Sequence, residues 1–275
     1  MVSRHQIKKA IKVLELACAE DFADVKNELT TALASAKQQI ENSDKAYKMI
    51  SRDMGKAQAM YNFDDNFFAN LKIDHPTIVK KFIQNWISKQ TDWRYPIVFI
   101  NAADAQYTYL GVKSLLTYVL SRKFTPKKSL EIILSKLSEQ ATPKQFRYKS
   151  FEHHGRITNM VVPHKQIGCI VCLDYFPYLS IEQINNFIES FNNLLRPGGQ
   201  AFIHFVDADG DEEWKGVVDK KYMYCTQEIL QKICDSFGLT IEFYNVKDCY
   251  SFASIKKPGM LTSNKKGPTK MQKIV

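Results

Sequence analysis

Residues 192–205 read Asn-Asn-Leu-Leu-Arg-Pro-Gly-Gly-Gln-Ala-Phe-Ile-His-Phe, and this stretch decides the fold. Upstream of it, residues 181–195 carry apolar side chains at helical spacing, at positions 184, 187, 188, 191, 194 and 195. Pro197 and the glycine pair end that helix. The apolar run 200–206 that follows is typical of a buried strand. The segment therefore predicts a helix, a tight turn and a central strand.

Further elements extend in both directions from this unit. We expect strands over the following ranges: 96–100, 114–120, 146–151, 167–173, 239–244 and 250–255. We expect helices over residues 62–71, 76–88, 128–137, 181–195 and 227–237. Short apolar strands that alternate with helices indicate an α/β fold with a mostly parallel sheet covered by helices.

The order of these elements resembles a known family. Residues 192–205, with their leucine-rich helix end and Pro-Gly-Gly turn, are similar to the helix–turn–strand that leads into the fifth strand of class I S-adenosylmethionine-dependent methyltransferases. Residues 169–180, Cys-Ile-Val-Cys-Leu-Asp-Tyr-Phe-Pro-Tyr-Leu-Ser, resemble the family's fourth strand and the loop after it. The resemblance covers about residues 92–255 and implies a Rossmann-like fold.

The cofactor positions that the resemblance implies depart from the family pattern. After its first strand the family has Asp/Glu-x-Gly-x-Gly, which lets the backbone approach the ligand closely. This chain has Asn101, Ala102, Ala103, Asp104 and Ala105 there, and its next glycine is Gly111. Only about a dozen residues then precede the second strand, which leaves little room for the usual helix.

The second strand should end in an acid that binds the ribose hydroxyls, but this chain has Ser121-Arg122-Lys123. We therefore interpret the pocket as vestigial, and predict no bound cofactor and no catalytic residue. Its positions are these: Asn101, Ala103, Asp104, Ser121 and Asp174. Asp174 follows the fourth strand, where some family members place functional groups, but a loop or helix-capping role explains it equally simply. The histidines at 153, 154, 164 and 204 have ordinary explanations as loop or strand residues.

The N-terminal region predicts a long amphipathic helix, from about residue 4 to residue 54. Its apolar residues follow an eleven-residue period at positions 7, 11, 14, 18, 22, 25, 29, 33, 36 and 40. A continuous helix of that length would span roughly 75 Å, more than a domain of this size can cover. Two interpretations remain open: the helix packs along its own domain, or it contacts another subunit.

The net charge of +9 is concentrated at the C-terminus. Residues 256–275 contain lysines at 256, 257, 265, 266, 270 and 273 and no acid. This tail is either a solvated end or an arm that orders on a partner. Since the rest of the chain is nearly neutral, we do not expect nucleic acid binding. The acidic loop 207–213 does not match a calcium-binding loop, and is expected to be a solvated turn after a strand, with contact to a basic neighbour as a further option.

The remaining motifs exclude other classes of site. Cys169 and Cys172 are the only close cysteine pair, but residues three apart in a strand face opposite sides, so we expect no metal site. No apolar run reaches the roughly 18 residues of a membrane span, and the first residues lack a signal-peptide core.

These observations predict three regions: a helical region 1–91, a methyltransferase-like domain 92–255 and a basic extended tail 256–275. The predicted function is a non-catalytic structural or assembly subunit that contacts other subunits, or further copies of itself. The combination of a helical arm, a methyltransferase-like fold with a degenerate cofactor site and a basic tail resembles virion structural proteins of contractile-tailed phages. This resemblance implies that the protein is part of a virion; without it, we expect a cytoplasmic location. The alternative is an active methyltransferase that binds S-adenosylmethionine through an atypical loop.

Overall fold

The computed structural model describes most of the α/β body and short parts of the N-terminal region. The described residues are 75–100, 107–121, 143–151, 156–158, 161–210, 213, 216–217, 221–247, 250–259 and 272–273, with 8, 10–13, 15, 30–38 and 40–41 near the N-terminus. The helices expected over 62–71 and 128–137 lie outside this set. No helix among the described residues is both long and apolar enough to cross a membrane.

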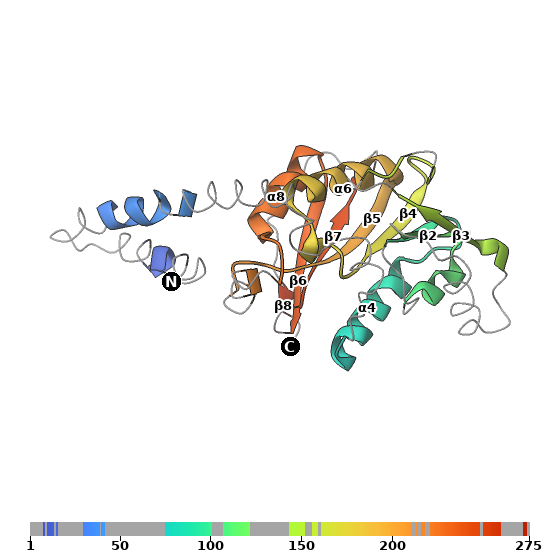
Figure 1. Cartoon of the computed structure of the whole chain (residues 1–275), viewed down its shortest axis with the longest axis horizontal. Helices are drawn as coiled ribbons and strands as arrows, with labels where there is room; N and C mark the ends of the chain where they lie inside the picture. The colour runs from blue at the N-terminus through green and yellow to red at the C-terminus, as the bar shows by residue number, and fades with distance from the viewer. Residues whose placement is uncertain are drawn as a thin grey trace.

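The body is one twisted sheet with helices on both faces (Figure 1). Its strands are β1 (Ile97–Ile100), β2 (Thr117–Ser121), β3 (Phe146–Ser150), β4 (Ile167–Cys172), β5 (Leu195–Phe205), β6 (Thr240–Lys247), β7 (Tyr250–Lys256) and β8 (Gln272–Lys273). Their order is β3-β2-β1-β4-β5-β7-β6-β8. The first five strands pair in parallel, and β7 is antiparallel to both β5 and β6. The predicted mostly parallel sheet is confirmed.

Two hydrophobic clusters cover the two faces of the sheet. The helices α6 (Ile181–Leu194) and α8 (Gln227–Ser236) pack on one face, and α4 (Thr77–Gln90) packs on the other. The α6 helix begins with a capping box, in which the Ser180 hydroxyl accepts from the Gln183 amide and the Gln183 side chain accepts from the Ser180 amide. The Trp86 ring of α4 stacks on Phe202 of β5 at 4.3 Å between centroids.

The position of α4 corrects the predicted boundary at residue 91. Val79, Ile83 and Ile87 are completely buried in the same cluster as strand residues of β1, β4 and β5. A helix with that much buried apolar surface contributes to the core of the sheet domain. The α/β unit therefore begins before residue 77 rather than at residue 92.

The Pro-Gly-Gly turn lies inside the first part of β5, where the register against β4 shifts. Gly198 has a φ of +78°, which favours glycine. A Cβ on Gly199 would lie 2.8 Å from the Ile167 carbonyl oxygen and 3.0 Å from that of Arg196. The second glycine is therefore required by close packing of β5 against β4.

The N-terminal region is helical at residues 10–13 and 30–38, as expected, but not as one straight helix. Lys37 Nζ and Glu15 Oε1 lie 2.6 Å apart. Twenty-two residues of continuous helix would separate these positions by about 33 Å, so the prediction of an uninterrupted helix over residues 4–54 is wrong.

Both chain ends contact the body. Lys8 pairs with Asp209 in the acidic loop after β5 and lies 3.8 Å from the Glu228 carboxylate of α8, so the option of a basic neighbour for that loop is confirmed. At the other end, Gln272 and Lys273 form β8, which pairs in parallel with β6. Most of the tail, residues 260–271, lies outside the described residues.

Candidate functional site

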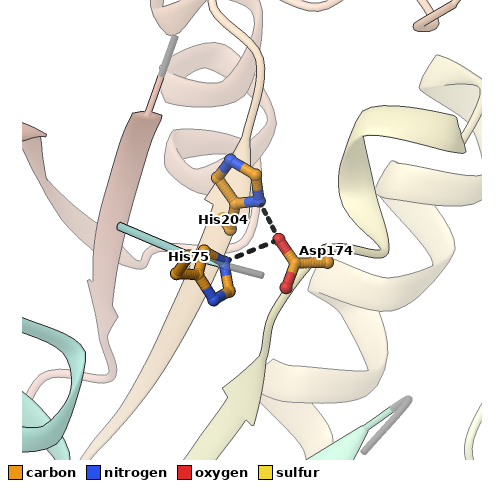
Figure 2. Close-up of side chains that lie close together, drawn as sticks. All are labelled: His75, Asp174 and His204. Atoms are coloured by element: carbon orange, nitrogen blue, oxygen red, sulfur yellow. Dashed lines mark hydrogen bonds and ion pairs between the residues drawn. The ribbon is translucent and has the colours of Figure 1, made fainter. Parts of the chain in front are cut away.

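The carboxyl ends of the parallel strands bring together three titratable side chains from distant parts of the sequence (Figure 2). Asp174 follows β4 by two residues, and His204 is the next-to-last residue of β5, the neighbouring strand. His75 directly precedes Pro76, the N-cap of α4. The strand order reverses between β1 and β4, and in open α/β sheets ligands bind at such a switch point, beyond the carboxyl ends.

The three side chains share one carboxylate oxygen. His75 Nε2 lies 3.1 Å from Asp174 Oδ1, and His204 Nδ1 lies 2.6 Å from the same atom. Tyr107 extends the cluster, because its hydroxyl lies 3.0 Å from His75 Nδ1. An ionised carboxylate only accepts hydrogen bonds, so His75 donates from Nε2, accepts at Nδ1, and the Tyr107 hydroxyl donates to it.

Burial isolates this cluster from solvent. The side chain of His75 is 0% exposed, that of His204 7% and that of Asp174 13%. The Tyr250 ring packs against both histidines, 5.7 Å from each ring centroid. The edge of the sheet around Asp174 is therefore filled by the chain's own side chains.

His204 makes a close contact without a well-aligned hydrogen bond. Both of its ring nitrogens are buried, and neither has a hydrogen-bond partner among the described residues. Its Nδ1 is nevertheless within ion-pair distance of the Asp174 carboxylate. Nδ1 therefore interacts with the Asp174 carboxylate, whereas Nε2 retains unused capacity for hydrogen bonding.

The electrostatics of the cluster favour an ionised Asp174. Burial raises the pKa of this carboxyl, but the charge of His204 and the side-chain contacts with His204 and His75 outweigh burial and lower the pKa to about 2. The backbone of Asp174 has a φ of 55°, in the left-handed region that aspartate tolerates better than most residues. This turn directs the chain from β4 into the short helix η4 (Phe176–Tyr178).

The structure describes two of the five predicted pocket positions, Ser121 and Asp174. Asn101, Ala103 and Asp104 lie outside the described residues, and Ser121 ends β2, where its backbone pairs with Ser150 of β3. Asp174 is the predicted position that the structure brings into a cluster of polar groups. The described part of the connection before β2 contains the six-residue 3₁₀ helix η2 (Thr108–Lys113).

The cysteine pair behaves as its spacing predicted. Cys169 and Cys172 belong to different hydrophobic clusters, on opposite faces of the sheet. Burial raises the pKa of both thiols far above its ordinary value. Because they lie on opposite faces of the sheet, the two thiols cannot share one metal ion.

Sequence reasoning missed the partners of Asp174. His204 could have been assigned to it, because β4 and β5 were expected to be parallel neighbours whose carboxyl ends meet at one edge. His75 and Tyr107 carried no such signal, since their contacts depend on how α4 and η2 pack on the sheet.

Comparison with known proteins supports the fold and goes no further. No family model matches the chain, and no curated protein matches it. Among solved structures, a putative O-methyltransferase from Nostoc punctiforme PCC 73102 has 8% identity and a TM-score of 0.50, with 66% of this chain and 57% of that chain covered. A SAM-dependent methyltransferase from Aquifex aeolicus has 13% identity and a TM-score of 0.48, with 71% and 98% covered. The [4+2]-cyclase SpnF has 11% identity and a TM-score of 0.49, with 65% and 80% covered.

The strand order, the antiparallel β7 and the likeness to the Nostoc protein agree with one another. The chain has the Rossmann-like fold of the class I S-adenosylmethionine-dependent methyltransferases.

Proposed function

We propose that this protein is a non-catalytic methyltransferase-like subunit of a larger protein assembly. One observation carries the proposal: the sheet edge beside the topological switch point is filled by His75, Asp174 and His204, with His75 completely buried. In this proposal, the edge at which such folds bind ligands has a structural role: His75, before α4, contacts Asp174 after β4, and Asp174 contacts His204 of β5.

The chemistry of Asp174 supports this proposal. A general base works best when its pKa lies near the operating pH. Because the pKa of Asp174 is about 2, its carboxylate is a weak proton acceptor at neutral pH. The loop at residues 101–106 adds to the argument, since it has no glycine to let the backbone approach an adenosyl group.

The assembly role rests on the ends of the chain. The N-terminal region has an apolar stripe and the tail is rich in lysine, and we propose that they contact other structural subunits or further copies of this chain. A phage virion is the assembly we propose, and that choice rests on the sequence resemblance alone. Neither a membrane nor a nucleic acid is part of the proposal.

A melting experiment on the full chain tests the loss of cofactor binding. S-adenosylmethionine or its demethylated product is added at millimolar concentration, and the melting temperature is measured with and without it. A ligand at 100 times its dissociation constant stabilises a protein by about 2.7 kcal/mol, which raises the melting temperature by several degrees. We expect no shift, and a clear shift would contradict the proposal.

Truncation tests the assembly role separately. Removing residues 1–55 leaves His75 and α4 in place, so we expect a folded domain that still unfolds cooperatively in a thermal melt, and a loss of binding to its partner subunits. A truncated chain that unfolds would show that the N-terminal region belongs to the domain's own core. A truncated chain that still assembles would refute the role of that region.

The second candidate is an active methyltransferase, and the fold itself favours it. Asp174 lies at the switch point, where a bound substrate could be oriented, and orientation alone supplies much of the rate in group transfer. This candidate requires saturable binding of S-adenosylmethionine through an atypical loop, so the melting experiment separates the two functions.

A further inference from the structure

We propose that His75, Asp174 and His204 bind one divalent transition-metal ion, and that Zn²⁺ fits the site best. Two imidazole nitrogens and a carboxylate oxygen form a donor set that zinc uses in proteins. The three ligand atoms, His75 Nε2, Asp174 Oδ1 and His204 Nδ1, all lie within 4.8 Å of one another. This proposal departs from the absence of a metal site that the sequence predicted, and it does not depend on the proposed function.

The spacing of the ligand atoms suits an ion at their centre. Zinc binds histidine nitrogen and carboxylate oxygen at about 2.0–2.2 Å, so two ligand atoms at a tetrahedral or octahedral angle lie about 2.8–3.6 Å apart. The separation of His75 Nε2 and Asp174 Oδ1, 3.1 Å, falls in that range. His204 Nδ1, at 2.6 Å from Asp174 Oδ1, needs to move outward by less than 1 Å.

His204 provides an independent reason to place an ion here. The residue as a whole is 5% exposed, and its buried Nε2 has no hydrogen-bond partner among the described residues. A buried polar group without a partner is costly, which makes such a group in a folded protein an indication of a missing ion or water. Its Nδ1 points at the oxygen that His75 also contacts, as Figure 2 shows.

The charge of the cluster and its surroundings agree with a cation. When both imidazoles are neutral, the buried cluster carries the single negative charge of Asp174, which a divalent ion offsets. The second nitrogen of His75 contacts the Tyr107 hydroxyl. With a metal on Nε2, His75 would carry its proton on Nδ1 and donate a hydrogen bond to the Tyr107 oxygen. Such a hydrogen bond from the second ring nitrogen orients metal-binding histidines.

The position of the ion defines its role. Its ligands come from three separate places: before α4, after β4 and near the end of β5. An ion bound there connects the residue before α4 to the two central strands β4 and β5. Three protein ligands leave a coordination position open to water.

The experiment uses the full chain without an affinity tag, treated with chelator and then titrated with Zn²⁺ alone. Bound zinc is measured by elemental analysis after gel filtration, and affinity by competition with a chromophoric chelator. The test variants are Asp174→Asn and His204→Gln, and the matched control is His164→Gln, a histidine in the loop before β4. Far-ultraviolet circular dichroism establishes whether each variant is folded.

We expect one zinc per chain in the wild type and in His164→Gln, and at least a 100-fold loss of affinity in each test variant. Tyr107→Phe should weaken binding by about 10- to 100-fold, as other losses of outer contacts do. A wild-type chain that binds no zinc, or test variants that bind as tightly as the wild type, would overturn the proposal.

Substitution with Co²⁺ keeps the proposal testable if the variants unfold. Cobalt bound to nitrogen and oxygen ligands gives visible d–d bands without an intense sulfur-to-cobalt charge-transfer band in the near ultraviolet. We expect this spectrum from the wild-type chain. A strong charge-transfer band would place the ion on cysteine and overturn the assignment.

Discussion

Replacement of Asp207 by asparagine should stabilise the protein at alkaline pH, although it removes a charge from the loop that meets Lys8. Burial raises the pKa of Asp207 from its ordinary value of 3.8 to about 6, and the nearby charge of Asp209 raises it further. The backbone amides of Asp209 and Gln227 donate hydrogen bonds to Asp207 Oδ1 at 3.3 and 3.4 Å. These bonds lower the pKa of Asp207, but by less than burial raises it. The ionised carboxylate is thus disfavoured in the folded state.

The sign of the pH dependence follows from this raised pKa. A carboxyl with a higher pKa in the folded state contributes stability below pH 3.8, and that stability is lost as the pH rises through about 6. The difference between these two values corresponds to about 3 kcal/mol, as an upper limit, since solvent reaches part of the side chain. An asparagine keeps the Oδ1 acceptor and has no charge to bury.

We therefore expect Asp207→Asn to exceed the wild type in unfolding free energy by about 1–3 kcal/mol at pH 8, and to match it near pH 4. Denaturant unfolding at pH 4, 6 and 8 measures this difference. Asp235→Asn, which changes an exposed carboxyl near the end of α8, is the matched control and should show little effect. A difference that does not vary with pH, or a variant less stable than the wild type at pH 8, would refute the reasoning.

Two further substitutions test how the sheet domain is held together. Trp86→Ala removes a buried ring that stacks on a β5 side chain, so it should lower the free energy of unfolding by about 3–5 kcal/mol in chemical denaturation. Trp93 is 74% exposed, so the control Trp93→Ala should change the free energy of unfolding by less than about 0.5 kcal/mol. Gly199→Ala puts a methyl group against two carbonyl oxygens and should cost about 1–3 kcal/mol, while Gly259→Ala, with no atom within 4 Å, should be neutral in the same thermal melts. Equal effects within either pair would contradict this account of the packing.

The sheet was predictable because its signals are local. The apolar runs, the Pro-Gly-Gly turn and the cap at Ser180 each specify their own segment, and their order specifies a parallel sheet. The strands expected over 146–151, 167–173 and 250–255 occur at 146–150, 167–172 and 250–256. The same logic placed Asp174 at the carboxyl edge.

The rest of the site depends on packing that no local pattern encodes. His75 reaches Asp174 only because α4 covers the sheet face, so 99 residues of sequence separate two groups in contact. In the N-terminal region, the eleven-residue period specified helix but not the contact between Glu15 and Lys37. A single amphipathic stripe can be covered by a partner subunit or by another part of the same region, and the sequence does not distinguish these outcomes.

The central claim is that the carboxyl edge of this fold no longer binds an adenosyl ligand. Equilibrium dialysis of the full chain against labelled S-adenosylmethionine tests it most directly, with an active methyltransferase of the same fold as the positive control. The account predicts no saturable binding up to millimolar concentration. Saturable binding of one molecule per chain would contradict it.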